Sequence, residues 1–159
     1  PCGYYGDPAH RCVCTPGQIQ RYLNRISGPL LDRIDIQVEI VPVSFDELTK
    51  CTPSESSAAI RERVIHARQI QEQRFAHEPG IHSNAQMTPR MVREYCVLSD
   101  ECDRLLAFAM DKMGFSARAY DRILKVARTI ADLAQSADIR PQHLLEAINY
   151  RTLDKTDTI

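Results

Sequence analysis

The most regular pattern in the sequence lies at residues 117–134, and it indicates that the second half of the chain is helical. Seven apolar residues recur there at helical spacing over about five turns: Tyr120, Ile123, Leu124, Ala127, Ile130, Ala131 and Ala134. Such a pattern is typical of a helix that packs one face against a core. Serine is a favoured N-cap residue, so we predict that this helix begins after Ser116.

Similar signals predict helices on both sides of this one. Thr-Pro pairs at 15–16, 52–53 and 88–89 can each place a threonine N-cap before a proline in the first helical turn. Glu55 completes a capping box with Thr52. Ser99 and Gly114 are typical of a helix start and a helix end. The predicted helices cover 16–25 (with Ile19, Leu23 and Ile26 on one face), 53–76 (a polar outer helix with the narrow seam Ile60, Val64, Ala67 and Ile70), 89–95, 100–113 and 141–150.

Residues 27–41 interrupt the helical pattern. Ser-Gly-Pro at 27–29 should end the first helix, and the alternation of Ile34, Ile36, Val38 and Ile40 predicts a buried or half-buried strand. A short helical turn is expected at 45–48. One helix and one strand cannot make a sheet alone, so we predict a mainly α fold. In it, 1–44 is a remnant of an αβ domain, 45–151 a helical bundle and 152–159 a frayed tail.

Charge and hydropathy limit the classes of function. Twenty Lys and Arg residues against 21 Asp and Glu leave no basic field that would attract nucleic acid. No apolar stretch is long enough to span a membrane and no secretory signal opens the chain, so we expect a cytoplasmic protein. The start at Pro1 and the absence of a Gly-x₄-Gly-Lys-Ser/Thr loop suggest a piece of a longer protein that does not bind nucleotide alone.

Two arginines are candidate site residues. Arg33 stands between Asp32 and Asp35 at the start of the predicted strand, and its planar guanidinium suits phosphate or carboxylate. The alternative from spacing alone is that Arg33 merely pairs with Asp35 at the start of the strand. Arg118 lies in the first turn of the core helix, where the helix dipole favours an anion. The alternative for Arg118 is an ordinary pair with an acidic neighbour, Asp121 or Glu101.

Cysteines form a third candidate site. Cys2, His10, Cys12 and Cys14 crowd into the first 14 residues. Thiol and imidazole groups at this density indicate zinc, although Cys-x-Cys is a less usual spacing than Cys-x₂-Cys. Either Cys2, Cys12 and Cys14 contribute to a structural Zn²⁺ site, or they are a cluster of reduced thiols. Cys51, Cys96 and Cys102 show no metal spacing.

Three segments carry a resemblance to a known family. They are Arg-Ile-Ser-Gly-Pro-Leu-Leu-Asp-Arg-Ile-Asp-Ile at 25–36, Pro-Cys-Gly-Tyr-Tyr at 1–5 and Gly-Phe-Ser-Ala-Arg-Ala-Tyr at 114–120. With them, nearly the whole chain resembles the magnesium-chelatase-like AAA+ ATPases of the ComM/YifB type. The resemblance implies the end of a nucleotide-binding αβ core followed by a helical lid. Many family members have a Cys-Pro-Cys-Gly opening, and this resemblance implies a four-cysteine site in the parent protein whose first cysteine precedes Pro1.

The resemblance also assigns roles to the arginines. It implies that Arg33 is an arginine finger for the γ-phosphate of ATP on the next subunit, with Asp32 and Asp35 orienting it. It implies that Arg118 is the sensor 2 arginine, which contacts the γ-phosphate of ATP bound by its own chain. A finger supplied in trans is worth about 10³ to 10⁵ in rate.

At the level of the full-length protein, the resemblance implies ATP and Mg²⁺ as cofactors and a hexameric homo-oligomer. Its activity would be DNA remodelling by branch migration in natural transformation, with the DNA held mainly outside these residues. A magnesium or cobalt chelatase-type motor subunit is an alternative, because such subunits share the motif around Arg33. A non-enzymatic helical module that docks a partner through 53–76 is another.

Overall fold

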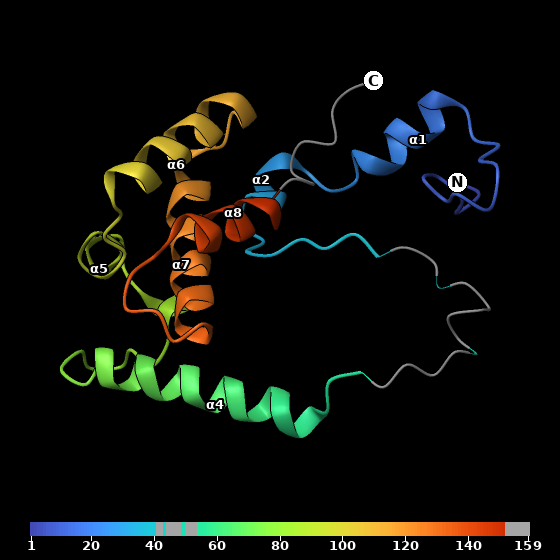
Figure 1. The fold of residues 1–159 in the computed structure, drawn as a ribbon. Helices are drawn as coiled ribbons and strands as arrows, with labels where there is room; N and C mark the ends of the chain where they lie inside the picture. The colour runs from blue at the N-terminus through green and yellow to red at the C-terminus, as the bar shows by residue number, and fades with distance from the viewer. Residues whose placement is uncertain (41–42, 44–48, 50–53, 152–159) are drawn as a thin grey trace.

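The computed structural model describes residues 1–40, 43, 49 and 54–151, and this part of the chain is helical without any strand. The prediction of a mainly α fold is confirmed. Figure 1 shows the elements, which in chain order are α1 (Pro16–Leu23), α2 (Gly28–Leu31), α4 (Ser57–Arg74), the 3₁₀ helix η1 (Asn84–Gln86), α5 (Pro89–Tyr95), α6 (Asp100–Met113), α7 (Ala117–Leu133) and α8 (Pro141–Asn149).

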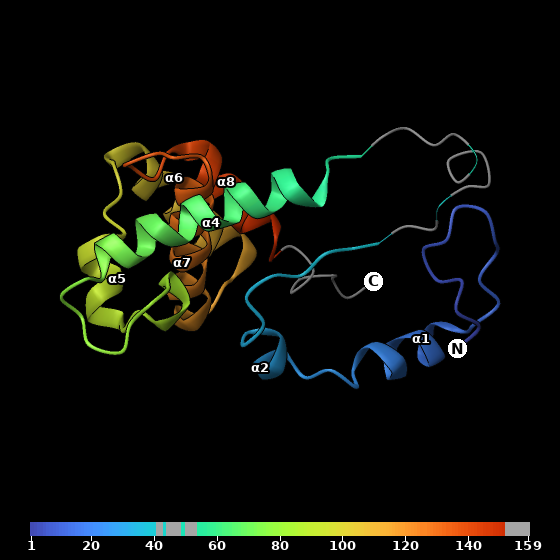
Figure 2. The ribbon, with the colours of Figure 1, turned by 90° about the horizontal axis from the view of Figure 1, so that it is seen from below.

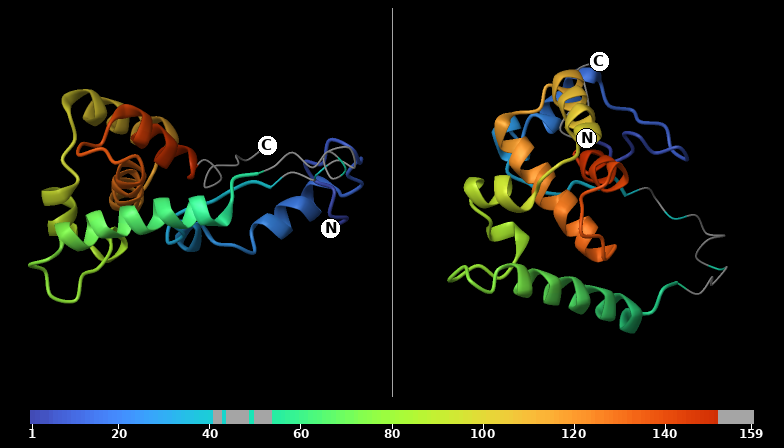
Figure 3. Two further views of the ribbon diagram at one scale, coloured as in Figure 1. Left: turned by 60° about the horizontal axis from the view of Figure 1, so that its bottom comes forward. Right: turned by 60° about the vertical axis from the view of Figure 1, so that its left-hand side comes forward.

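Helix α7 is the centre of the bundle, and it packs one face against the core as its sequence pattern predicts. It packs against α4, η1, α5 and α8, and α6 packs against α8. Its apolar face is almost fully removed from solvent at Ala119, Ile123, Leu124, Ala127 and Ala131. Each buried Ile or Leu contributes about 1.5–3 kcal/mol. Figures 1 and 3 show α4 crossing α7 near the C-terminal end of α7.

Side-chain caps determine several helix ends. The hydroxyls of Ser99 and Ser116 each accept a backbone hydrogen bond at 3.3 Å in the first turn of α6 and α7. Thr88 does the same for α5 at 3.4 Å. Gly114 adopts the left-handed conformation (φ 54°, ψ 42°) that ends α6. The predicted bounds of α5 and α6, 89–95 and 100–113, are confirmed.

Helix α4 begins later than predicted. Residues 54–56 are not helical, and Ser56, not Thr52, is the N-cap, accepting from the Ala59 N–H at 3.2 Å. Thr52 itself lies outside the described residues. The Glu55 carboxylate is not part of a capping box; it pairs with both terminal nitrogens of Arg63 at 2.9 and 3.1 Å. Glu55 thus lies before the helix, whose first residue is Ser57.

The apolar seam predicted for α4 is buried only in part. Ala67 is buried, whereas Ile60 and Val64 are 41% and 40% exposed. Figures 1 and 2 show why: the N-terminal half of α4 extends beyond the other helices of the bundle, which cover only its C-terminal half.

The predicted strand is wrong for residues 34–40, and Val41 lies outside the described residues. The segment is extended, but it pairs with no strand among the residues described, and Ile34, Ile36, Val38 and Ile40 are 39%, 49%, 63% and 88% exposed. A strand needs a neighbour for its backbone hydrogen bonds. Here the end of α8 supplies a backbone partner instead of a strand: the Gln37 N–H donates to the Tyr150 carbonyl at 2.9 Å.

The N-terminal part differs from prediction in two details. Helix α1 ends at Leu23, and Ser27, which was expected only to help end that helix, is the N-cap residue of α2. The apolar face predicted for α1 is largely uncovered, with Leu23 41% and Ile26 50% exposed. Figures 1 and 2 both show α1 and the loop before it standing apart from the bundle.

Two predicted segments lie outside the described residues, namely the helical turn at 45–48 and the tail at 152–159. The boundary between the two predicted domains falls in the same undescribed stretch and stays a prediction. Among the helices that the structure describes, none is long and apolar enough to cross a membrane.

Candidate nucleotide-facing site

A cavity of about 650 Å³ lies between α7, α8 and the extended segment that follows α2. Three cations on successive turns of α7 line it: Arg118, Arg122 and Lys125. Their spacing of four and three residues places them on one side of the helix. The rest of the wall is acidic, apolar or neutral polar and includes Asp35, Ile36, Val38, Asp121, Val126, Thr129, Ile130, Leu133, Glu146 and Tyr150.

The three cations differ in their contacts. Arg122 forms an ion pair with Asp35, and the Lys125 ammonium donates to the Ala85 carbonyl at 3.1 Å. Arg118 is exposed and has no ion pair or hydrogen bond to another described residue, so neither Asp121 nor Glu101 is its ion-pair partner. It lies in the first turn of α7, where the helix dipole adds to its own charge. Of the three cations that line the cavity, Arg118 can therefore pair with an anion without giving up a contact to another described residue.

Arg33 lies elsewhere. It is exposed in the turn after α2, and its Nη1 donates to the Pro29 carbonyl at 3.1 Å. It does not line the cavity that contains Arg118. The local pair with Asp35 is not formed, because Asp35 pairs with Arg122. Within this chain, neither Asp32 nor Asp35 contacts the Arg33 guanidinium by an ion pair.

Arg151 is a site residue that the sequence analysis missed. Its side chain is fully buried at the end of α8, where Nη1 donates to the Ile34 carbonyl at 2.6 Å and Nη2 lies 3.8 Å from the Asp32 carboxylate. It thus holds the residues on both sides of Arg33 against the bundle. A partner 117 residues away in sequence leaves no local pattern that could have revealed it.

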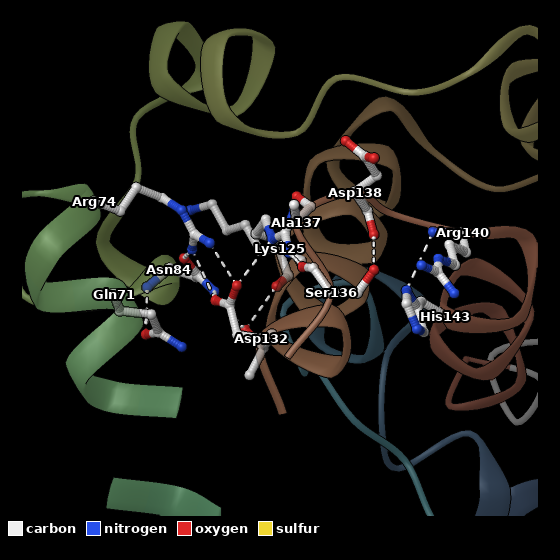
Figure 4. A network of polar contacts seen from close by, with 12 residues as sticks. Gln71, Arg74, Asn84, Lys125, Asp132, Ser136, Ala137, Asp138, Arg140 and His143 are labelled. Atoms are coloured by element: carbon white, nitrogen blue, oxygen red, sulfur yellow. Dashed lines mark hydrogen bonds and ion pairs between the residues drawn. The ribbon is translucent and has the colours of Figure 1, made fainter. Parts of the chain in front are cut away.

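A second buried network joins α4, η1 and α7 (Figure 4). The Asp132 carboxylate accepts from Arg74 at 2.8 and 2.5 Å, from Arg128 at 3.1 Å and from the Asn84 amide at 2.8 Å. Arg128 and Asp132 are 3% and 0% exposed. One carboxylate on α7 thus compensates two guanidinium groups, one of which comes from α4, so the network links the two helices. Its role is structural.

Two buried groups outside these networks, Cys96 and His143, have shifted pKa values. Burial raises the pKa of the Cys96 thiol to about 11. Burial, and then the charges of Arg140 and Arg128, lower the pKa of His143. The His143 Nδ1 accepts a hydrogen bond from the Arg140 N–H at 3.1 Å, which requires that nitrogen to be unprotonated.

The three N-terminal cysteines come together as predicted, but His10 does not join them. The Sγ atoms of Cys2, Cys12 and Cys14 all lie within 4.8 Å of one another. The His10 ring stacks on Tyr4, and its Nδ1 lies 3.0 Å from the Asp7 carboxylate. Hydrogen bonds from the backbone N–H groups of Tyr4 and Val13 lower the pKa of Cys2 to about 6.

Comparison with known proteins points to one family. The model for magnesium chelatase, subunit ChlI C-terminal, matches residues 54–151, and the model for magnesium chelatase, subunit ChlI, matches residues 1–48. Uncharacterized protein YifB of Escherichia coli (strain K12) is 43% identical over 156 residues, which cover 98% of this chain and 29% of that protein. Competence protein ComM of Haemophilus influenzae is 40% identical over 154 residues, with 96% and 29% covered.

A more distant relative, an uncharacterized protein of Mycobacterium tuberculosis, is 30% identical over 151 residues, with 95% of this chain and 30% of that protein covered. The chain therefore spans less than a third of the length of these curated relatives.

Proposed function

Because the chain belongs to the magnesium chelatase ChlI family and is of the ComM/YifB type, we propose that it is the lid-bearing part of a cytoplasmic AAA+ ATPase. In the full-length protein, ATP with Mg²⁺ would be hydrolysed at the subunit interfaces of a hexameric ring. Hydrolysis would drive DNA remodelling of the branch-migration kind used in natural transformation. The DNA would be held mainly outside these residues, since their net charge is only −1.

The observation that carries this proposal is the state of Arg118. An exposed arginine in the first turn of the central helix, at the edge of a cavity with two further cations, offers a charged contact to a phosphate without first breaking an ion pair within the described chain. In the proposal, Arg118 contacts the γ-phosphate of the ATP bound by its own chain. Loss of that phosphate then releases α7 and the helices packed on it.

Arg33 has the properties that an arginine finger needs. Its side chain is exposed and is held by one neutral carbonyl, so it can exchange that contact for a phosphate of the adjacent subunit. Its backbone is held firmly, because Arg151 contacts the residues before and after it. A finger must be both accessible and well positioned to stabilise the charge that develops on the phosphoryl oxygens. In the proposal, Asp32 and Asp35 position Arg33 through Arg151 and Arg122.

The first test uses Arg33→Ala in the full-length protein, with Arg63→Ala, an exposed arginine on α4, as the matched control. ATP affinity should stay within about two-fold, while ATP turnover should fall by about 10³ or more. The control should keep normal turnover. Turnover of Arg33→Ala within a few-fold of wild type would show that Arg33 is not the finger.

Mixed rings test whether the finger acts in trans. Arg33→Ala subunits keep an intact nucleotide site, and subunits with a disabled phosphate-binding loop keep an intact Arg33. Mixing the two inactive forms should restore part of the ATPase activity if Arg33 serves the neighbouring site. If Arg33 served its own site, the mixture would stay inactive.

Arg118→Ala should behave differently from Arg33→Ala. Because Arg118 is proposed to contact ATP in both the bound and the reacting state, its removal should weaken nucleotide binding and also slow hydrolysis. Normal values for both would contradict the sensor role. Arg104→Ala is the control, because Arg104 is an exposed arginine on α6 that does not line the cavity.

A chelatase-type motor is the second candidate, favoured by the description of the two matching family models. Magnesium or cobalt chelatase motors share the proposed arginine chemistry but act on a different partner. ATPase activity that is stimulated by branched DNA supports the first candidate. Activity that ignores DNA supports the second.

A further inference from the structure

The loop at residues 2–14 brings three thiols together without a hydrophobic core to do so. Every residue in it is exposed or half-buried, and the main hydrophobic cluster of the described chain contains none of them. Segments that cannot bury enough apolar surface are commonly held by a disulfide or a metal ion. Cys2, Cys12 and Cys14 are all free thiols. Of the two kinds of cross-link, a bound metal ion is therefore the one that remains for this loop.

The distances between the sulfur atoms suit a tetrahedral metal. The Cys2 and Cys12 Sγ atoms are 3.5 Å apart, far beyond the ~2.05 Å of a disulfide. Two thiolates on one zinc, each with a Zn–S bond of about 2.3 Å at the tetrahedral angle, would lie about 3.8 Å apart. All three Sγ atoms fall within 4.8 Å of one another, so small adjustments would place them on one ion.

The backbone of the loop is shaped to present these sulfurs. Gly3 and Gly6 have φ of +91° and +82°, values that side chains other than hydrogen rarely allow. Gly6 lies in a turn closed by a hydrogen bond from the Asp7 N–H to the Tyr4 carbonyl at 3.2 Å. The Cys2 N–H donates to the Cys14 Sγ at 3.0 Å, a contact typical of sulfur ligands in metal sites.

From this geometry we propose that Cys2, Cys12 and Cys14 bind one Zn²⁺ ion that organises residues 2–14. Soft thiolates in a tetrahedral arrangement favour zinc over magnesium or calcium, which prefer oxygen ligands. Three thiolates leave one coordination position. His10 does not occupy it, because it lies outside the sulfur group and is bonded to Asp7. A water molecule completes the site.

The test begins with the zinc content of the full chain, purified in reducing buffer and supplied with Zn²⁺ before desalting. Mass spectrometry of the metal should find about one equivalent per chain. Cys12→Ser should retain less than a fifth of that amount. Cys102→Ala is the matched control, because it removes a buried thiol on α6 and leaves the loop intact. Less than a fifth of an equivalent in the wild-type chain, or equal zinc in all three proteins, would overturn the proposal.

Two further measurements identify the ligands and exclude a disulfide. Co²⁺ in place of Zn²⁺ should give the thiolate charge-transfer absorption in the wild type and in Cys102→Ala, and a clearly weaker one in each of Cys2→Ser, Cys12→Ser and Cys14→Ser. Thiol titration should reveal three more reactive thiols after chelation than before it. A Cys2–Cys12 disulfide in reducing buffer, or absorption that is indifferent to the substitutions, would refute the site.

Proteolysis reports the structural effect of the metal. Trypsin can cleave after the exposed Arg11, which lies inside the proposed metal loop. Bound Zn²⁺ should slow this cleavage several-fold, a chelator should abolish the protection, and Cys12→Ser should be cleaved fast under both conditions. Helical circular dichroism should be equal in all variants, since the loop lies outside the core. Cleavage that does not respond to Zn²⁺ would show that the ion does not organise the loop.

Discussion

Asp132 is the residue whose side chain makes the most hydrogen bonds in the network between α4 and α7. Its carboxylate has no solvent exposure and accepts hydrogen bonds from Arg74, Arg128 and Asn84. Asp132→Asn removes the charge and keeps the shape. Two guanidinium groups, one of them 3% exposed, then lose their counter-ion while they remain inside the protein.

The expected loss is large. Breaking a buried ion pair by removing one partner costs about 3–5 kcal/mol, because the other charge stays uncompensated. The exposed pair of Glu55 and Arg63, with side chains 45% and 51% exposed, provides the contrast. Glu55→Gln should cost at most about 1 kcal/mol. For a helical unit of about 100 residues, Asp132→Asn should lower Tm by about 12 °C or more.

Urea unfolding followed by circular dichroism at 25 °C measures the free energy of unfolding of both variants. The pairwise contribution comes from the double variant Arg74→Met with Asp132→Asn. Because the two residues are in contact, the double change should cost less than the sum of the single changes by about 0.5–3 kcal/mol. If Asp132→Asn lowers the free energy of unfolding by less than about 1 kcal/mol, or if the two changes are strictly additive, the network does not stabilise the packing of α4 on α7.

Two further predictions concern a helix end and a buried histidine. Gly114→Ala should destabilise the chain by about 1–2 kcal/mol, because Gly114 ends α6 with φ of 54°, a left-handed value that a Cβ makes unfavourable; a change within error in urea unfolding would contradict this. The folded state lowers the pKa of His143 below its ordinary 6.5, so the unfolded chain binds the proton more tightly. Stability should therefore be fully present above about pH 6.5 and fall as the pH drops through the folded pKa, by at most about 1.4 kcal/mol per pH unit. His143→Gln should remove this dependence, and an identical pH profile in the variant would refute the assignment.

The parts of the fold that the sequence predicts well are those decided within a few residues. Ser99, Gly114 and Ser116 act on the turn next to them, so the bounds of α6 and the start of α7 follow from local chemistry. The start of α4 was missed because Ser56 is also a favoured N-cap residue, and the local pattern does not decide between Ser56 and Thr52. The alternation of apolar residues at 34–40 does indicate an extended backbone. Whether that backbone pairs into a sheet depends on a neighbouring strand, which no local pattern reveals.

The candidate site residues also differ in whether a local pattern reveals them. The sequence singles out Arg118 by its position just after a helix cap, and it singles out the three cysteines by their density near the start of the chain. Arg151 and Asp132, in contrast, act across 117 and 58 residues of sequence. Their importance depends on burial, which single-sequence patterns do not report for a charged residue, because most arginines and aspartates are exposed.

Helix α7 connects the features that the structure reveals separately. Its first turn carries Arg118, its second turn contacts the segment of Arg33 through the pair of Arg122 with Asp35, and its last turn holds α4 through Asp132. A packed helix moves as a rigid body, since its neighbours resist local deformation. A displacement of Arg118 by a phosphate would therefore change the position of the Arg33 segment and of α4 together. If Arg118 and Arg33 act as proposed, this arrangement would link the nucleotide of one subunit to the finger that the same subunit presents to the next.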